Sequence, residues 1–211
     1  MTDDRRLLHG IAQQDQGAFR EFYDRHGDRV FNVALGFLRQ QSDAEEVTQD
    51  VFVEVYRSAQ RFRGDSSVGT WLHRITVRKS LDRIRHAKRK RRFATFTQSL
   101  GLGTGNEAAP QTDFDHPGVL LDRREDAALL SRLIDELPER QRTAFVLCFV
   151  QGLPRQEAAD TMEVKLKALE SLLQRAKSGL RAKLDPHFPG RGLDVRSEQR
   201  KSRQTASKDT E

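Results

Sequence analysis

Proline is absent from the first half of the chain, and this absence constrains the fold more than any other feature. The chain has 211 residues and six prolines, of which the first is Pro110. Because proline removes a backbone donor and clashes with the preceding helical turn, a segment without it can form long uninterrupted helices. The later prolines then mark where shorter helices begin or end: Pro117, Pro138, Pro154, Pro186 and Pro189.

Two segments of the proline-free half have apolar residues at a helical period. The first spans residues 18–38, and the second begins at Ser42 and ends near Arg61. Ser42 and Glu45 have the spacing of a capping box at the start of the second helix. The outer face of that helix is acidic, with Asp43, Glu46, Asp50 and Glu54. Two interpretations are open: an ordinary solvated face, or a docking surface for a basic partner helix.

The next stretch, residues 61–92, carries most of the excess positive charge. It contains twelve Lys or Arg and two acidic residues, a local net charge of +10, whereas the whole chain is +6. Val77, Leu81 and Ile84 repeat at helical spacing and predict a helix with one inward face. Its outward side carries Arg74, Arg78, Arg85 and Arg89. Such a concentration is typical of proteins that bind nucleic acid, although a solvated helix followed by a basic run has the same composition.

A turn-rich segment, Phe62 to Ser67, precedes this basic helix. We expect Ser66 or Ser67 to be the N-cap of the helix, because a serine hydroxyl can accept a bond from a free backbone amide. Trp71, in the first turn, has two interpretations: an anchor in the core, or a platform on which a base stacks.

The second half predicts a linker, a compact helical unit and a tail. Residues 93–122 lose all periodicity and are rich in Gly and Pro, which favours a flexible linker. Helices are then predicted to end at Leu137, to begin at Pro138-Glu139 and at Pro154, and to run from Lys165 to about Leu184. The last two fit a helix-turn-helix, with a generic small helical bundle as the alternative. The polar segment 185–211 predicts a disordered tail.

Several kinds of site are absent from the sequence. The single cysteine, Cys148, excludes an internal disulfide and is expected to be a buried small apolar residue. The six histidines lack metal-ligand spacing, and no nucleophile, base and acid cluster together, so we expect no catalytic residues, no metal and no cofactor. No run approaches the roughly 18 apolar residues of a membrane span. We expect a soluble cytoplasmic protein that is not an enzyme.

The motifs, taken in order, resemble one family. An acidic helix, the segment FRGDSS followed by TWL, and ELPERQR followed by a helix-turn-helix are together similar to the bacterial extracytoplasmic-function (ECF) sigma factors. These are the two-domain class of sigma-70-like initiation factors, and the resemblance covers residues 15–92 and 125–184. It implies an all-α fold in which a flexible linker, 93–122, joins domains 1–92 and 123–184. It also implies that the chain directs RNA polymerase to promoters.

The resemblance assigns residues to three surfaces. The first domain would dock on a coiled coil of the polymerase's largest subunit through Asp43, Glu46, Gln49 and Asp50. The turn and the basic helix would capture and hold the opened −10 element through Phe62, Arg63, Asp65, Ser66, Ser67, Trp71, Arg74, Arg78, Arg85 and Lys88. The second domain would bind the polymerase flap and read the −35 element through Arg155, Lys165, Lys167, Ser171 and Arg175. An anti-sigma factor, possibly tethered to a membrane, is the implied regulator.

The chain departs from the family pattern at four positions. Arg78 stands where Asn is frequent, which favours phosphate contact over base reading. Glu163 stands where the helix-turn-helix usually has Gly, so it must adopt a strained turn or a different geometry. Glu170 replaces a frequent Lys, and could accept from a cytosine amino group or repel phosphate. Leu172 replaces a frequent Arg.

Other classes of function are also compatible with the pattern. A stand-alone helix-turn-helix regulator should bind duplex DNA without polymerase and needs no acidic docking helix. A helical adaptor, or a nucleic-acid enzyme whose site is not apparent in the sequence, is a further alternative.

Overall fold

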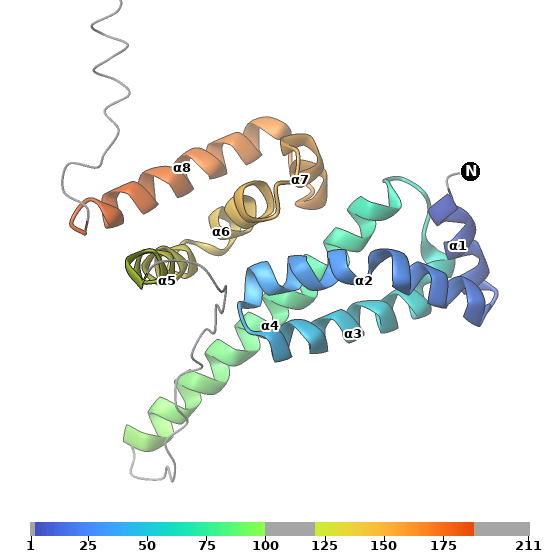
Figure 1. Cartoon of the computed structure of the whole chain (residues 1–211), viewed down its shortest axis with the longest axis horizontal. Coiled ribbons are helices and arrows are strands. Elements are labelled where there is room, and N and C mark those ends of the chain that lie inside the picture. Colours follow the sequence, from blue (N-terminus) through green and yellow to red (C-terminus); the bar gives the residue numbers. More distant parts are fainter. Residues whose placement is uncertain (1–2, 100–120, 188–211) are drawn as a thin grey trace, which may run out of the picture.

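The computed structural model describes residues 3–99 and 121–187, and every regular element in these two ranges is helical (Figure 1). The elements of the first half are α1 (Asp3–Ala12), α2 (Gln16–Leu38), α3 (Gln41–Ser58), the short 3-10 segment η1 (Ala59–Arg61) and α4 (Val68–Ser99). Those of the second half are α5 (Leu121–Asp135), α6 (Glu139–Phe145), the π-helical segment η2 (Val146–Val150), α7 (Arg155–Thr161) and α8 (Leu166–Leu184). We call α1–α4 the first module and α5–α8 the second. No described helix is both long and apolar enough to cross a bilayer.

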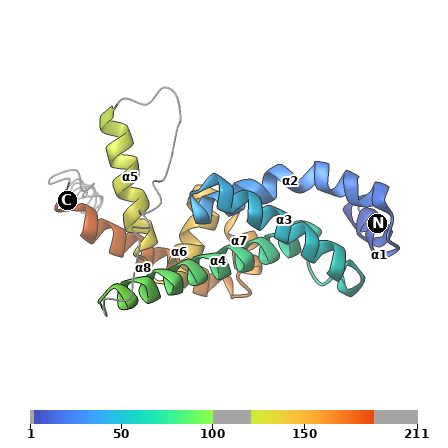
Figure 2. The same ribbon diagram turned by 90° about the horizontal axis from the view of Figure 1, so that it is seen from below.

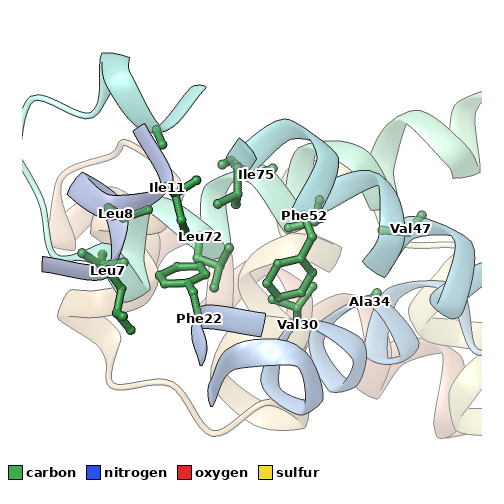
Figure 3. Close-up of a cluster of buried hydrophobic side chains, with 14 of the residues drawn as sticks. Leu7, Leu8, Ile11, Phe22, Val30, Ala34, Val47, Phe52, Leu72 and Ile75 are labelled. Carbon is green, nitrogen blue, oxygen red and sulfur yellow. The ribbon is translucent and has the colours of Figure 1, made fainter. Parts of the chain in front are cut away.

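The core of the first module lies between α1, α2, α3 and the start of α4 (Figure 3). Phe22 is fully buried, and Phe52 packs against it with ring centroids 6.3 Å apart. Helix α1 was not among the predicted elements. It closes one end of this core with Leu7, Leu8 and Ile11, each at most 3% exposed. Its ten residues are too few to establish a helical period against so many charged neighbours.

The boundaries of α2 and α3 correct one expectation. The carboxylate of Asp15 caps α2 by accepting bonds from two backbone amides. The capping box predicted at Ser42 and Glu45 is wrong, because α3 begins one residue earlier, at Gln41, after Gln40. Ser42 is therefore already inside the first turn, and Glu45 accepts a 2.9 Å bond from the Gln41 side chain.

Helix α4 begins where the sequence placed it and extends further than expected. Ser67 is the cap, since its hydroxyl accepts from the backbone amide of Thr70 at 3.0 Å. The helix has 32 residues, about 48 Å of axis, and continues past Arg92 to Ser99. Its C-terminal part projects beyond α2 and α3 in both views (Figures 1 and 2). The predicted linker thus begins with helix, and residues 100–120 lie outside the described residues, as does the predicted tail from 188 on.

The second module packs α8 against α6 and α7. Its buried residues include Leu147, Ala158, Leu169, Ala176 and Leu180. Pro138 and Pro154 are the residues immediately before α6 and α7, as predicted, where their missing N–H groups leave no helical bond unmade. Cys148 is half-buried against this cluster, and burial raises the pKa of its thiol.

The two modules contact each other through α2 and α4. Val33 and Phe37 of α2 and Val77 of α4 are buried in the same apolar cluster as the core of the second module. The row Val77, Leu81 and Ile84 therefore faces the second module. The core of the first module instead receives a different row of α4, Val68, Leu72 and Ile75.

Candidate nucleic-acid interface

The basic residues of α4 lie in two different environments. Arg78 is 60% exposed at its side chain and lies 3.5 Å from Glu54, while Lys88 is exposed further along the helix. Arg74 and Arg85 instead reach the second module. Arg74 donates two bonds to the backbone carbonyl of Asp160, at 2.8 and 3.1 Å, and Arg85 pairs with Glu139 at 3.0 Å.

A groove of about 580 Å³ runs along this side of α4. Four of the predicted −10 residues line it together: Trp71, Arg74, Arg78 and Arg85. Arg140 of α6 adds a further cation that the sequence analysis missed. Five arginines and three glutamates line the groove, so its net charge is positive. With one indole among its lining residues, it has the chemistry to hold phosphates and to stack a base.

The turn before α4 brings the remaining −10 candidates to the start of that helix. Phe62 packs on Trp71 with ring centroids 5.2 Å apart, and both rings are half-buried against the first core. Trp71 therefore anchors the turn and also borders the groove, so the two interpretations of this residue are not exclusive. Gly64 has φ +80°, and Arg5 donates a 3.0 Å bond to its carbonyl. Arg63, Asp65 and Ser67 are exposed and Ser66 is half-buried.

The four predicted docking residues on α3 separate into two pairs. Asp43 and Glu46 both bind Arg83 of α4, at 2.6 and 2.5 Å, and these hydrogen bonds raise the pKa of the guanidinium. Gln49 and Asp50 are exposed near the middle of the same helix. Gln49 also lines a groove of about 440 Å³ with Tyr23 and Asp28 of α2. No role for Arg83 was predicted, because its position opposite α3 becomes evident only from the packing of the two helices.

The predicted −35 residues form one exposed surface on α7 and α8. Lys167, Ser171 and Arg175 recur every four residues along α8, which places them on the same face. Lys165 is the N-cap residue of that helix, and Arg155 is the first residue of α7. All five candidates are exposed.

Three of the departures from the family pattern have a physical explanation. Glu163 adopts φ +54°, so the turn keeps the left-handed geometry that a glycine would adopt more easily. Glu170 lies 3.7 Å from Arg155, which reduces its repulsion of a phosphate. Leu172 is partly buried against the second module's core and is not part of the exposed surface.

Comparison with known proteins identifies both modules. Residues 22–90 match the family Sigma-70 region 2, and residues 127–180 match Sigma-70, region 4. The chain is 35% identical over 179 residues to the ECF RNA polymerase sigma factor SigE of Mycolicibacterium smegmatis, covering 83% of this chain and 66% of SigE. It is 32% identical over 179 residues to the ECF RNA polymerase sigma factor SigK of Mycolicibacterium vanbaalenii, covering 83% of this chain and 85% of SigK.

A solved structure has the same arrangement of helices. CnrH, in complex with the cytosolic domain of CnrY, superimposes with a TM-score of 0.59 at 25% identity, over 88% of this chain and 99% of CnrH. Both modules, their order and their fold thus agree with the resemblance found in the sequence. The chain belongs to the extracytoplasmic-function (ECF) sigma factors of the sigma-70 family.

Proposed function

We propose that this chain binds the core of RNA polymerase and directs it to a defined set of promoters, where it opens the DNA for initiation. The observation that carries the proposal is that two surfaces of opposite charge lie next to each other on the first module. An acidic face on α3, which includes the exposed Gln49 and Asp50, lies next to a helix whose cations are spread along a groove. A protein that binds only duplex DNA does not need the acidic face.

The first module has groups that can offset the free-energy cost of unstacking a base. Unstacking a base costs a few kcal/mol, and stacking it on an aromatic ring returns about 1–3 kcal/mol. In this chain the aromatic pair Phe62 and Trp71 supplies the ring, and the turn between them supplies polar groups around the captured base. Arg78 and Lys88 would bind the backbone of the same strand through charge.

The second module would read the upstream −35 element through α8. Lys167 and Arg175 have the chain lengths and charges to contact phosphates and guanine edges, and Ser171 lies between them. Since Leu172 is partly buried and Glu170 is paired with Arg155, we expect these two positions to add little to base recognition.

The chain would contribute binding and no chemistry of its own, so we propose that it is not an enzyme and that it acts in the cytoplasm with the polymerase. We further infer regulation by an anti-sigma protein. The complex of CnrH with a cytosolic domain supports a regulator that is itself attached to a membrane.

Transcription with purified components tests the proposal. Core polymerase, the chain and a library of upstream DNA regions from the source genome should give transcripts with discrete start sites, and core polymerase alone should not. If no region yields a discrete transcript, and the chain alone binds duplex sites tightly, then the stand-alone regulator is the better account.

A further inference from the structure

The turn between Phe62 and Ser67 receives little support from its own backbone. Among the described residues, none of the backbone groups of residues 63–66 bonds to another backbone group. Gly64, in the middle of the turn, has φ +80°, a conformation that glycine adopts with far less strain than other residues. The conformation of the turn therefore depends on contacts from outside it.

Helix α1 makes contacts of this kind from both of its ends. Arg5, in the first turn of α1, donates a 3.0 Å bond from Nη2 to the carbonyl oxygen of Gly64. Gln60, in η1 just before the turn, donates a 3.0 Å bond to the carbonyl oxygen of Ala12, the last residue of α1. Helix α1 thus packs beside η1 and the connection from α3 to α4 (Figure 1).

Helix α1 is itself held firmly by the rest of the first module. Its three side chains in the first core are each at most 3% exposed. Arg25 of α2 also pairs with Asp3 and Asp4, at 2.6 and 3.1 Å. Exposed ion pairs stabilise little by themselves, whereas apolar burial fixes the helix on the core. Arg5 therefore reaches the turn from a rigid support.

Arg5 and Arg6 are adjacent in the sequence but have different partners. Arg5 bonds to the turn, while Arg6 pairs with Asp3 of its own helix at 2.9 Å. Both arginines are exposed, so replacing either one removes a positive charge without leaving a cavity in the core. Arg6 is therefore a matched control for Arg5.

We propose that Arg5 is a positioning residue for base capture: it holds the carbonyl of Gly64 and keeps the turn in the conformation that selects a base of the −10 element. The proposal rests on the function proposed above, since it takes the turn to be the part that captures the base. Helix α1 ends before residue 15, where the family resemblance begins, so the resemblance assigns no such role.

A positioning role and a direct contact with DNA have different consequences. If the turn leaves the capturing conformation, the apparent affinity for the selected base falls in proportion to the population that remains competent. The phosphate contacts of α4 are unaffected, so binding of other sequences does not change. An arginine that touched a phosphate would instead add affinity for every sequence alike.

The test measures base selection by the complex of the full chain with core polymerase. Labelled single-stranded oligonucleotides carry the −10 element of a promoter found by transcription with core polymerase, with its own base or another base at each position. Fluorescence anisotropy at several salt concentrations gives the dissociation constants. The ratio of the two constants, at the position where the unmodified chain discriminates most, measures capture.

We expect Arg5→Gln to lower this ratio about fivefold and Arg6→Gln to leave it unchanged. Arg5→Lys, which keeps a charged donor, should restore most of the ratio. The salt dependence of binding should be the same in all three variants. A ratio for Arg5→Gln equal to that of the unmodified chain would overturn the proposal. So would an unchanged ratio with a salt slope lowered by about 0.7, because Arg5 would then be a phosphate contact.

The unmodified complex separates this proposal from the one on which it rests. If it prefers no base at any position of the −10 element, base capture by the turn fails, and the role of Arg5 fails with it. If it prefers a base and Arg5→Gln retains that preference in full, the role of Arg5 is disproved and the proposed function remains.

Discussion

Glu163 combines a strained backbone conformation with an ion pair to the first module. Its backbone is left-handed, at φ +54°, which costs a residue other than glycine about 1 kcal/mol. Its carboxylate lies 3.5 Å from Arg74 of the first module. A glycine would relieve the strain and lose the ion pair, which is worth little because the Glu163 side chain is 72% exposed.

Replacing Glu163 by glycine should therefore stabilise the second module. We expect Glu163→Gly to raise the free energy of unfolding by about 1 kcal/mol relative to Glu163→Ala, which removes the same carboxylate and keeps the strain. Urea denaturation of the two variants measures the difference. Equal midpoints would show that the turn is not strained.

His73 is a buried ionisable group at the contact between the modules. It is 1% exposed, and its Nδ1 lies 3.4 Å from a carboxylate oxygen of Glu157 on α7. Burial, together with smaller contributions from the charges of Arg29 and His26 on α2, lowers the pKa of His73 from 6.5 to about 4, so the ring is neutral in the folded protein at pH 7.

The depressed pKa makes stability depend on pH. Between pH 6.5 and 4 the unfolded chain binds a proton at His73 and the folded chain does not, so stability falls as pH falls through this window, by up to about 3 kcal/mol. Above pH 6.5 both states are neutral and this dependence ends. His73→Phe should remove that part of the pH dependence in urea titrations at several pH values. A variant with the same slope as the unmodified protein between pH 4 and 6.5 would contradict the assignment.

At the scale of the elements, α4 packs on two different apolar cores, which a single helical period in the sequence does not reveal. Val68, Leu72 and Ile75 face the first core, while Val77, Leu81 and Ile84 face the second module. Both rows have the spacing i, i+4, i+7, but Ile75 and Val77 are two residues apart and so lie about 200° from each other on the helix. The sequence showed the second row clearly, but could not say that a distant module covers it.

The parts of the fold that the sequence predicted are those with strong local signals. Pro138, Pro154 and the serine at position 67 mark helix starts, and the long apolar stripes mark α2, α3 and α8. What it missed depends on contacts between distant residues. Helix α1 is defined by packing on α2, and Arg83 acquires its partners only when α3 and α4 align. The same holds for the candidate site. Its residue types could be predicted from the sequence, but the ion pairs between them could not.

The exposed middle of the acidic face of α3 gives a direct test of docking. Asp50→Arg reverses a charge that has room to contact a partner, and should weaken binding to core polymerase at least tenfold without unfolding the first module. Glu21→Arg, an equal reversal on α2 where the side chain is 49% exposed, is the control. Equal binding of core polymerase by both variants would remove α3 as the docking face.

Arg78 tests the phosphate contacts of α4. Each phosphate contact to single-stranded DNA contributes about 0.7 to the slope of log affinity against log salt. Arg78→Gln should lower that slope by about this amount and weaken binding to all sequences alike. Arg20→Gln, which removes an exposed charge from α2, should leave the slope unchanged. An unchanged slope for Arg78→Gln would exclude a phosphate contact at this residue.

At the scale of the whole molecule, the two modules have complementary charges and a shared apolar seam. Arginines belong to the first module and carboxylates to the second in all four arginine–carboxylate pairs that the described residues place across this contact.

We expect the chain to open promoter DNA only together with polymerase. Permanganate reactivity of unpaired thymines measures this directly on a promoter found by the transcription selection. We predict reactive thymines at the −10 element when core polymerase and the chain are both present, and none with either alone. Fully paired DNA in the presence of both, or unpaired thymines with the chain alone, would contradict the account.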